Sequence, residues 1–483
     1  MVNRRFSFRR APMLASLLAV VLAAPLAAQA DRWQVAVDAG AAAYRQGRLA
    51  EAERHFRDAH AAAALYAPGD PRLALTLNNL GEVLRRQGQL AEAEIYYVQA
   101  LTLAEQTGGR FDPVIADSLG NLGELYHDAG RLAEAEALHR KALSLREAGV
   151  GADHAQVATT LNNLAAVVAA RGRDDEAATL YRRALDIAER TPGGGHPDLA
   201  DILNNLAAAE IARGRPAAAE VHYLRSIAVW EAAHGEFDPH LADLLDNLGS
   251  FYAAGGHFAE AEQALLRVVT IVERTRGLRH PDVAGAQRNL AAVYVRQGNL
   301  AAAEPRLTLA RDILAQSYGE VDARVAPLVV ERADLHFAQG GLAAAEDGYR
   351  RALAIDAELY RAPSFAAAHS LHRLAEIERR RGNLDEAEPL LRQAIGIVEA
   401  AWGTGHPRLA PMVAGLALLH HGQGRYGEAE ALYRRALNLF ETAVGADVAW
   451  AECQENFADL LTLTGRAAEA ETLLQQAHLR RGA

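Results

Sequence analysis

One glycine position recurs along the chain at a nearly constant interval. Successive members of the series stand about 42 residues apart, inside the range of about 20 to 50 that is typical of solenoids, propellers and other repeat arrays. Such a period outweighs any single local motif as evidence of fold. The series predicts eleven copies of one structural unit, marked by Gly47, Gly88, Gly130, Gly172, Gly214, Gly256, Gly298, Gly340, Gly382, Gly424 and Gly465.

Two further positions of the unit hold small residues. An alanine stands five residues after the glycine in every copy, from Ala52 to Ala470, and a glycine or alanine stands seven residues before it, as at Gly81 and Ala165. Small residues let two helix backbones approach closely, where a larger side chain would overpack the crossing. Apolar residues on both sides of the glycine follow helical spacing, and no segment alternates as a strand would. Each unit is therefore predicted to be a helical hairpin.

Prolines mark the start of the first helix in the unit. Proline suits the first helical position because the donor that it lacks has no partner there. We expect helix A of each unit to run from this proline to the turn glycine, and helix B to follow the turn. The two His-Pro-Asp tripeptides, at 196–198 and 280–282, are interpreted as helix starts of this kind. Six prolines share the phase, each after Asp or His: Pro71, Pro113, Pro197, Pro239, Pro281 and Pro407.

These features resemble a known repeat. The order of small residue, turn glycine and two alanines, the second at Ala100 or Ala142, resembles the tetratricopeptide repeat. The longer period, with Leu-Asn-Asn-Leu-Ala at 161–165 and His-Pro-Asp at 196–198, resembles its kinesin light chain type. The resemblance covers about residues 33 to 480. It implies an all-α fold, a right-handed superhelical solenoid of about eleven helix–turn–helix repeats of about 42 residues each, and a function in binding peptides or proteins.

The predicted domains are a signal peptide over residues 1–30 and a solenoid over 31–480. Copies eight to eleven depart from the pattern because the Asn-Leu pair is missing at 331–332, 373–374 and 415–416. We therefore do not expect one continuous groove through all copies. The predicted repeats span about 33–66, 71–107, 113–147, 155–190, 197–233, 239–275, 281–318, 323–360, 365–402, 407–443 and 448–480.

The N-terminal segment, residues 1–30, differs from the rest. Four arginines precede an apolar run from Met13 to Leu26, and the small residues Ala28-Gln29-Ala30 stand before Asp31. This is the charged region, the apolar region too short for a membrane span and the cleavage site of a secretory signal. We expect a mature chain that begins near Asp31 and is periplasmic or secreted, without membrane insertion. Anchoring by an uncleaved N-terminal segment is the alternative.

Composition and net charge limit the classes of partner that the chain is expected to bind. The formal charge is -11, and removal of the four N-terminal arginines with the signal takes it to -15. A nucleic-acid partner is not expected, because no basic run follows the signal. A single cysteine, Cys453, cannot form an internal disulfide. Lys141 is the only lysine beside 49 arginines, a bias typical of a GC-rich bacterial genome.

No catalytic constellation stands out. The chain has no Gly-rich phosphate loop with its lysine, no Gly-x-Ser-x-Gly segment and no His-Glu-x-x-His pair. Acids at the start of helix B, such as Glu92 and Glu94, complement the helix dipole and need no catalytic explanation. We expect no enzymatic activity, no metal site and no cofactor.

Asparagine recurs nine residues before the turn glycine, which we call the ladder position. An amide competes for backbone hydrogen bonds inside a helix, so its repetition needs a cause. The resemblance places this position on the concave face, where an amide would offer a donor and an acceptor to an extended peptide. The alternative is an amide that bonds between neighbouring helices. The predicted peptide-binding residues are Asn79, Asn121, Asn163, Asn205, Asn247 and Asn289, with Asn456 at the same position after a gap.

We favour the peptide ladder. The function predicted from the sequence is therefore an exported scaffold whose concave face binds a peptide or protein segment. The alternative is a structural module that joins copies of itself through the ends of the array.

Overall fold

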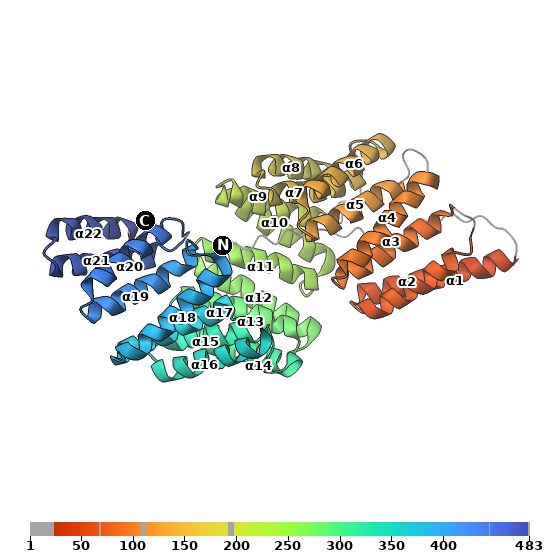
Figure 1. The fold of residues 1–483 in the computed structure, drawn as a ribbon. Helices are drawn as coiled ribbons and strands as arrows, with labels where there is room; N and C mark the ends of the chain where they lie inside the picture. Colours follow the sequence, from red (N-terminus) through yellow and green to blue (C-terminus); the bar gives the residue numbers. More distant parts are fainter. Residues whose placement is uncertain (1–23, 67–68, 108–112, 192–197, 444, 482–483) are drawn as a thin grey trace. The chain divides into compact units, whose positions relative to one another are not determined.

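The protein is a chain of paired helices. The computed structural model describes residues 24–66, 69–107, 113–191, 198–443 and 445–481, so most of the predicted signal peptide lies outside the described residues. Within the described ranges all regular elements are helical (Figure 1). The first hairpins are α1 (Ala24–Arg45) with α2 (Leu49–Ala63), α3 (Pro71–Arg86) with α4 (Leu90–Thr107), α5 (Pro113–Asp128) with α6 (Leu132–Val150), α7 (Ala155–Ala170) with α8 (Asp174–Arg190), and α9 (Leu199–Ala212) with α10 (Pro216–His234). The next helices along the chain are α11 (Pro239–Ala254) and α12 (Phe258–Arg276).

The remaining hairpins follow the same order of helix A and helix B. A short 3-10 turn, η1 (Pro407–Leu409), precedes α19. The later helices are α13 (Pro281–Arg296) with α14 (Leu300–Tyr318), α15 (Ala326–Ala338) with α16 (Leu342–Leu359), α17 (Phe365–Arg381) with α18 (Leu384–Trp402), α19 (Ala410–Gly422) with α20 (Tyr426–Phe440), and α21 (Asp447–Leu463) with α22 (Ala467–Arg481).

The predicted all-α solenoid of helical hairpins is confirmed, while its right-handed superhelix stays a prediction. Each of the eleven turn glycines has a φ between 70° and 85°, the left-handed region that favours glycine. The alanine five residues later is fully or almost fully buried in every copy. The first A helix begins earlier than expected, at Ala24 rather than near residue 33.

The small residue of helix A has a packing cause. In the second hairpin, a Cβ added to Gly81 would lie 2.7 Å from the Tyr97 ring. The tyrosine of α4 therefore packs directly on the backbone of α3, and its side chain is fully buried. This contact holds the two helices of a hairpin close together.

Helix starts follow the interpretation of the proline motifs. Asp70 accepts a hydrogen bond from the Arg72 N–H at 3.0 Å at the start of α3. In the same way His280 Nδ1 accepts from the Asp282 N–H at 3.2 Å at the start of α13. The tripeptide at 280–282 is thus a helix cap, whereas residues 196 and 197 lie outside the described residues.

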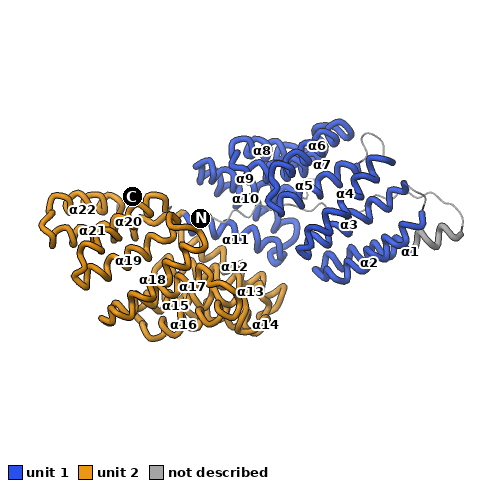
Figure 2. The backbone as a smooth tube through the Cα atoms, viewed as in Figure 1, with its two compact units in different colours: residues 1–254 blue, residues 255–483 orange. Residues whose placement is uncertain are grey.

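The chain divides into two compact units, one up to Ala254 and one from Gly255 onward (Figure 2). The first unit holds α1 to α11, and buried apolar residues such as Leu164 and Tyr181 form its core. The second holds α12 to α22, where the rings of Tyr433 and Phe457 stack with centroids 5.4 Å apart. None of the described helices is long and apolar enough to cross a membrane.

Candidate binding surface on the A helices

The six predicted ladder residues all lie on A helices but differ in exposure. Asn163 of α7 is 6% exposed and Asn205 of α9 is fully buried. The other four, on α3, α5, α11 and α13, are half-buried: Asn79, Asn121, Asn247 and Asn289. Asn289 belongs to the second unit and also has a polar contact within the chain.

Three ladder amides bridge neighbouring A helices of the first unit. Asn205 Nδ2 donates to Asn162 Oδ1 of α7 at 3.0 Å. Asn247 Nδ2 donates to Asn204 Oδ1 of α9 at 3.0 Å. Asn163 Nδ2 donates to a Glu124 carboxylate oxygen of α5, also at 3.0 Å. The donors of these three amides are therefore occupied within the chain, as the alternative of a helix-bridging amide expects.

The residue just before the ladder position supplies two of the acceptors. Asn162 and Asn204 each precede a ladder asparagine and accept the amide of the next repeat. Consecutive Asn-Asn pairs thus link one A helix to the next. The repeat pattern in the sequence does not by itself predict this link. Its signal was the polar residue directly before the ladder asparagine in the preceding copy.

Two of the six predicted ladder amides are open. Asn79 and Asn121 form no side-chain hydrogen bond within the described part of the chain. The first repeat has Val37 where an acceptor would stand, so Asn79 has no partner on α1. In the second repeat Asn78 Nδ2 donates instead to Ser118 Oγ at 2.9 Å, and its Oδ1 is buried without a donor among the described residues. Asn79 and Asn121 therefore keep both donor and acceptor capacity.

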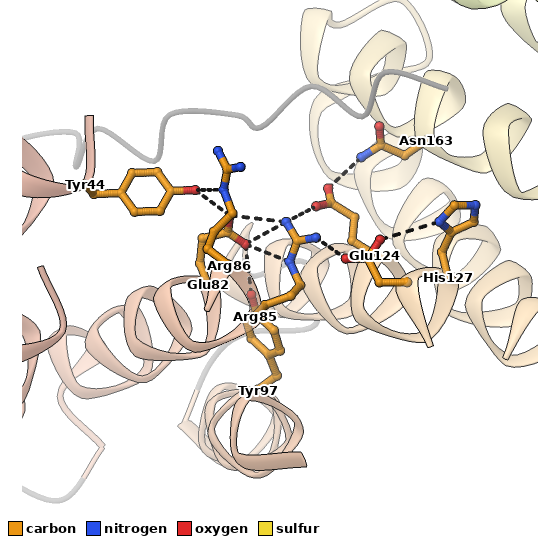
Figure 3. A network of polar contacts seen from close by, with 9 residues as sticks. Tyr44, Glu82, Arg85, Arg86, Tyr97, Glu124, His127 and Asn163 are labelled. Atoms are coloured by element: carbon orange, nitrogen blue, oxygen red, sulfur yellow. Dashed lines mark hydrogen bonds and ion pairs between the residues drawn. The ribbon is translucent and has the colours of Figure 1, made fainter. Parts of the chain in front are cut away.

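A charged network joins α3 and α5, the two helices that carry the open amides, and Figure 3 shows its side chains. The Arg85 side chain is 7% exposed and pairs with Glu82 at 2.9 Å, with Glu124 at 3.1 Å and with Asp128. Burial lowers the pKa of Arg85, but the surrounding carboxylates outweigh it and raise that pKa above its ordinary value. Arg85 is therefore a permanent positive charge that ties α3 to α5.

The same network reaches the first hairpin. The Tyr44 hydroxyl of α1 donates to Glu82 at 2.5 Å and accepts from Arg86 Nε at 3.2 Å. Tyr97 of α4 also donates to Glu82, at 3.1 Å. Glu82 thus receives contacts from three helices, which fix the charged side chains of α3 in place.

Comparison with known families identifies the repeat. A sequence profile of the tetratricopeptide repeat matches more than half of the chain. This chain belongs to the tetratricopeptide-repeat (TPR) family. A profile of the MalT-like TPR region also matches residues 279–481. The TPR matches cover residues 34–106, 114–190, 156–232, 198–273 and 240–316.

Several solved structures are similar to this chain at low sequence identity. A signal-transduction ATPase with a TPR sensor, from Pyrococcus horikoshii, is 16% identical with a TM-score of 0.53, over 76% of this chain and 53% of that one. A putative kinesin light chain with TPR-like repeats, from Podosopora anserina, is 25% identical over 42% of this chain and 96% of that one, with a TM-score of 0.37. BtubC from P. vanneervenii is 18% identical over 57% of this chain and 91% of that one, with a TM-score of 0.35. No curated protein matches the chain.

TPR arrays are typically scaffolds for protein–protein interaction, with extended surfaces formed by successive repeats. In this TPR array the open amides share helix faces with exposed charges. Arg86 follows Asn79 by seven residues on α3, and Asp128 follows Asn121 by seven on α5, so each pair lies on one side of its helix, two turns apart. The Arg86 and Asp128 side chains are 41% and 38% exposed. We call these four residues the open-amide surface.

No group of three or more His, Cys, Asp or Glu side chains within the described ranges could hold a metal ion. Burial raises the pKa of the Cys453 thiol to about 12, so it is unreactive at neutral pH.

Proposed function

We propose that this TPR array binds an extended segment of a protein partner on the open-amide surface of its second and third repeats. The observation that carries the proposal is the contrast within the ladder. Asn163, Asn205 and Asn247 donate to neighbouring helices, whereas the amides of Asn79 and Asn121 have no hydrogen-bond partner within the described part of the chain. An extended backbone offers the matching acceptor and donor groups.

The charged network supports this proposal by fixing the surface in advance. Arg85 and Glu82 are held by contacts from several helices. The positions of the neighbouring residues Arg86 and Asp128 are therefore fixed before a partner binds. A surface fixed before binding loses less conformational entropy when its partner docks. Arg86 and Asp128 have opposite charges, which would set the direction of the bound segment.

The proposed function includes export. The three-part pattern over residues 1–30 is the basis for it, and the mature chain would act in the periplasm or outside the cell. If residues 1–40 are fused to a reporter that is active only after export, we expect the reporter to be active. A silent reporter, with the full-length protein in the cytosol, would contradict export but not partner binding. Self-assembly through the ends of the array stays the alternative prediction.

Binding is tested with a library of random ten-residue peptides selected on the chain from Asp31 onward. The affinity of the selected peptide is then measured by fluorescence anisotropy. Changing both Asn79 and Asn121 to Ala should weaken binding by about 1 to 3 kcal/mol, since each amide would lose one hydrogen bond or more.

The ladder position of the last repeat provides a matched control for the double variant. Asn456 is half-buried and likewise has no hydrogen bond within the described part of the chain. Asn456→Ala should leave the peptide affinity unchanged. Equal losses in the control and in the double variant, or no loss in either, would place the binding surface elsewhere.

A further inference from the structure

One core position of the repeat differs in the third copy. The residue nine positions after the turn glycine is buried in the first ten copies, and in repeats 1 to 3 it packs against the small residue of helix A. Repeat 3 has a histidine there, and the other ten copies have aromatic or aliphatic side chains. The series is Phe56, Tyr97, His139, Tyr181, Tyr223, Leu265, Leu307, Tyr349, Leu391, Tyr433 and Leu474.

The His139 ring is enclosed without polar partners. It is 1% exposed, and neither ring nitrogen has a hydrogen-bond partner in the described structure. A Cβ added to Gly123 would lie 2.7 Å from Nε2, so the ring sits against the backbone of α5. Gly123 is two residues from Asn121 and one from Glu124. The ring therefore supports the part of α5 that carries the open-amide surface.

The second repeat has a hydrogen bond at this core position that the third repeat lacks. Tyr97 packs under Gly81 in the same way, and its hydroxyl donates to Glu82 at 3.1 Å. Glu124 is the equivalent of Glu82 in the third repeat. The shorter His139 side chain forms no such bond, so a protonated ring has no carboxylate partner in its buried site.

Burial of the ring and the positive groups around it both oppose its protonation. Burial is the main cause that lowers the pKa of His139 to about 3, and His127 of α5 and Arg146 of α6 lower it further. Helix α7, on the next hairpin, has no titratable side chain. The charged side chain of α3 that pairs with α5 is Arg85, which is itself positive and already paired with carboxylates.

We propose that His139 makes the third repeat an acid-sensitive latch for the open-amide surface. When the ring takes up a proton it leaves the space between α5 and α6, and the hairpin that carries Asn121 opens. The buried ring cannot keep the proton, because the site is shielded from bulk solvent and offers no hydrogen-bond acceptor among the described residues. The consequence for binding rests on the function proposed above, whereas the opening of the hairpin does not.

The direction with pH follows from the lowered pKa. His139 has an ordinary pKa of 6.5 when the hairpin is open and about 3 when it is closed. The closed state is therefore fully favoured above pH 6.5 and loses stability as the pH falls toward 3. Below 6.5 the opening constant rises by up to about tenfold per pH unit, which gives about a 30-fold rise at pH 5.

Hydrogen exchange of the full chain, corrected for intrinsic rates, tests the latch. The opening constant of residues 113–150 should rise about 30-fold between pH 7.5 and pH 5 in the wild type. His139→Tyr copies the Tyr97 arrangement and should remove this rise. His139→Leu, the residue of repeats 6, 7 and 9, is a second variant that should remove it if tyrosine does not fit.

The outcomes separate the latch from the binding proposal. A wild type without the rise, or an equal rise in both variants, would overturn the latch. If the hairpin opens at pH 5 in the wild type alone and the selected peptide is released, both proposals are supported. If the hairpin opens but the peptide keeps its affinity, the latch stands and the proposed binding surface is wrong.

Discussion

At the scale of single residues, one type of side chain at one repeat position has two environments. Asn205 is fully buried and bonds to Asn162 of the preceding A helix, while Asn79 is half-buried and has no hydrogen bond within the described chain. The difference comes from the preceding copy, which offers an amide oxygen in one case and Val37 in the other. The neighbour one repeat away therefore decides whether the amide is available to a partner.

This difference predicts that the same substitution has a large effect on stability at one position and a small effect at the other. Asn205→Ala should lower the free energy of unfolding by about 1 to 3 kcal/mol, because the buried Asn162 Oδ1 loses its donor. Asn79→Ala should change it by less than about 0.5 kcal/mol, since alanine favours the helix and no internal bond is lost. Urea unfolding of both variants measures this. Equal changes would mean that the two amides have the same environment.

The ladder position could be predicted from the sequence, but the environment of each amide was not. The period shows that six consecutive copies carry Asn nine residues before the glycine. Whether an amide bonds within the chain depends on which side chain of the neighbouring helix faces it. The structure brings Asn163 to Glu124, for example, although they are 39 residues apart.

At the scale of the hairpin, close contact between helices A and B requires the small residue before the turn. The alignment of copies predicted this requirement, and the Gly81 contact with Tyr97 gives its physical cause. The histidine at the equivalent of Tyr97 in repeat 3 shows a limit of the pattern. A period predicts that the site is buried, whereas the absence of polar partners for His139 follows only from the packed structure.

Gly81→Ala should destabilise the protein by about 1 to 3 kcal/mol, because the new methyl group would overlap the Tyr97 ring. Gly120 of α5 is a matched control, a helical glycine with no atom within 4 Å of an added Cβ. Gly120→Ala should stabilise the helix by about 0.5 to 1 kcal/mol. Thermal unfolding of the two variants is the measurement, and a loss in the control as large as in Gly81→Ala would contradict the packing argument.

At the scale of the whole chain, repetition made the fold predictable. Eleven in-phase glycines, each followed five residues later by an alanine, predict a helical solenoid from the sequence alone. In the structure these alanines are buried. The polar contacts were not predictable in this way because they differ between copies. The second unit shows this at the ladder position of repeat 8, where Glu331 stands in place of an asparagine. Glu331 pairs there with Arg288 of the preceding repeat. Partner binding is therefore a property of particular repeats, and the proposal assigns it to repeats 2 and 3.

The position of the bound segment tests this assignment most directly. Hydrogen exchange of the full chain at pH 7.5, with and without the selected peptide, shows which helices the peptide protects. The proposal predicts protection in α3 and α5, over residues 71–86 and 113–128, with no change in α15 or α17 of the second unit. Protection confined to B helices or to the second unit, with α3 and α5 unchanged, would contradict it.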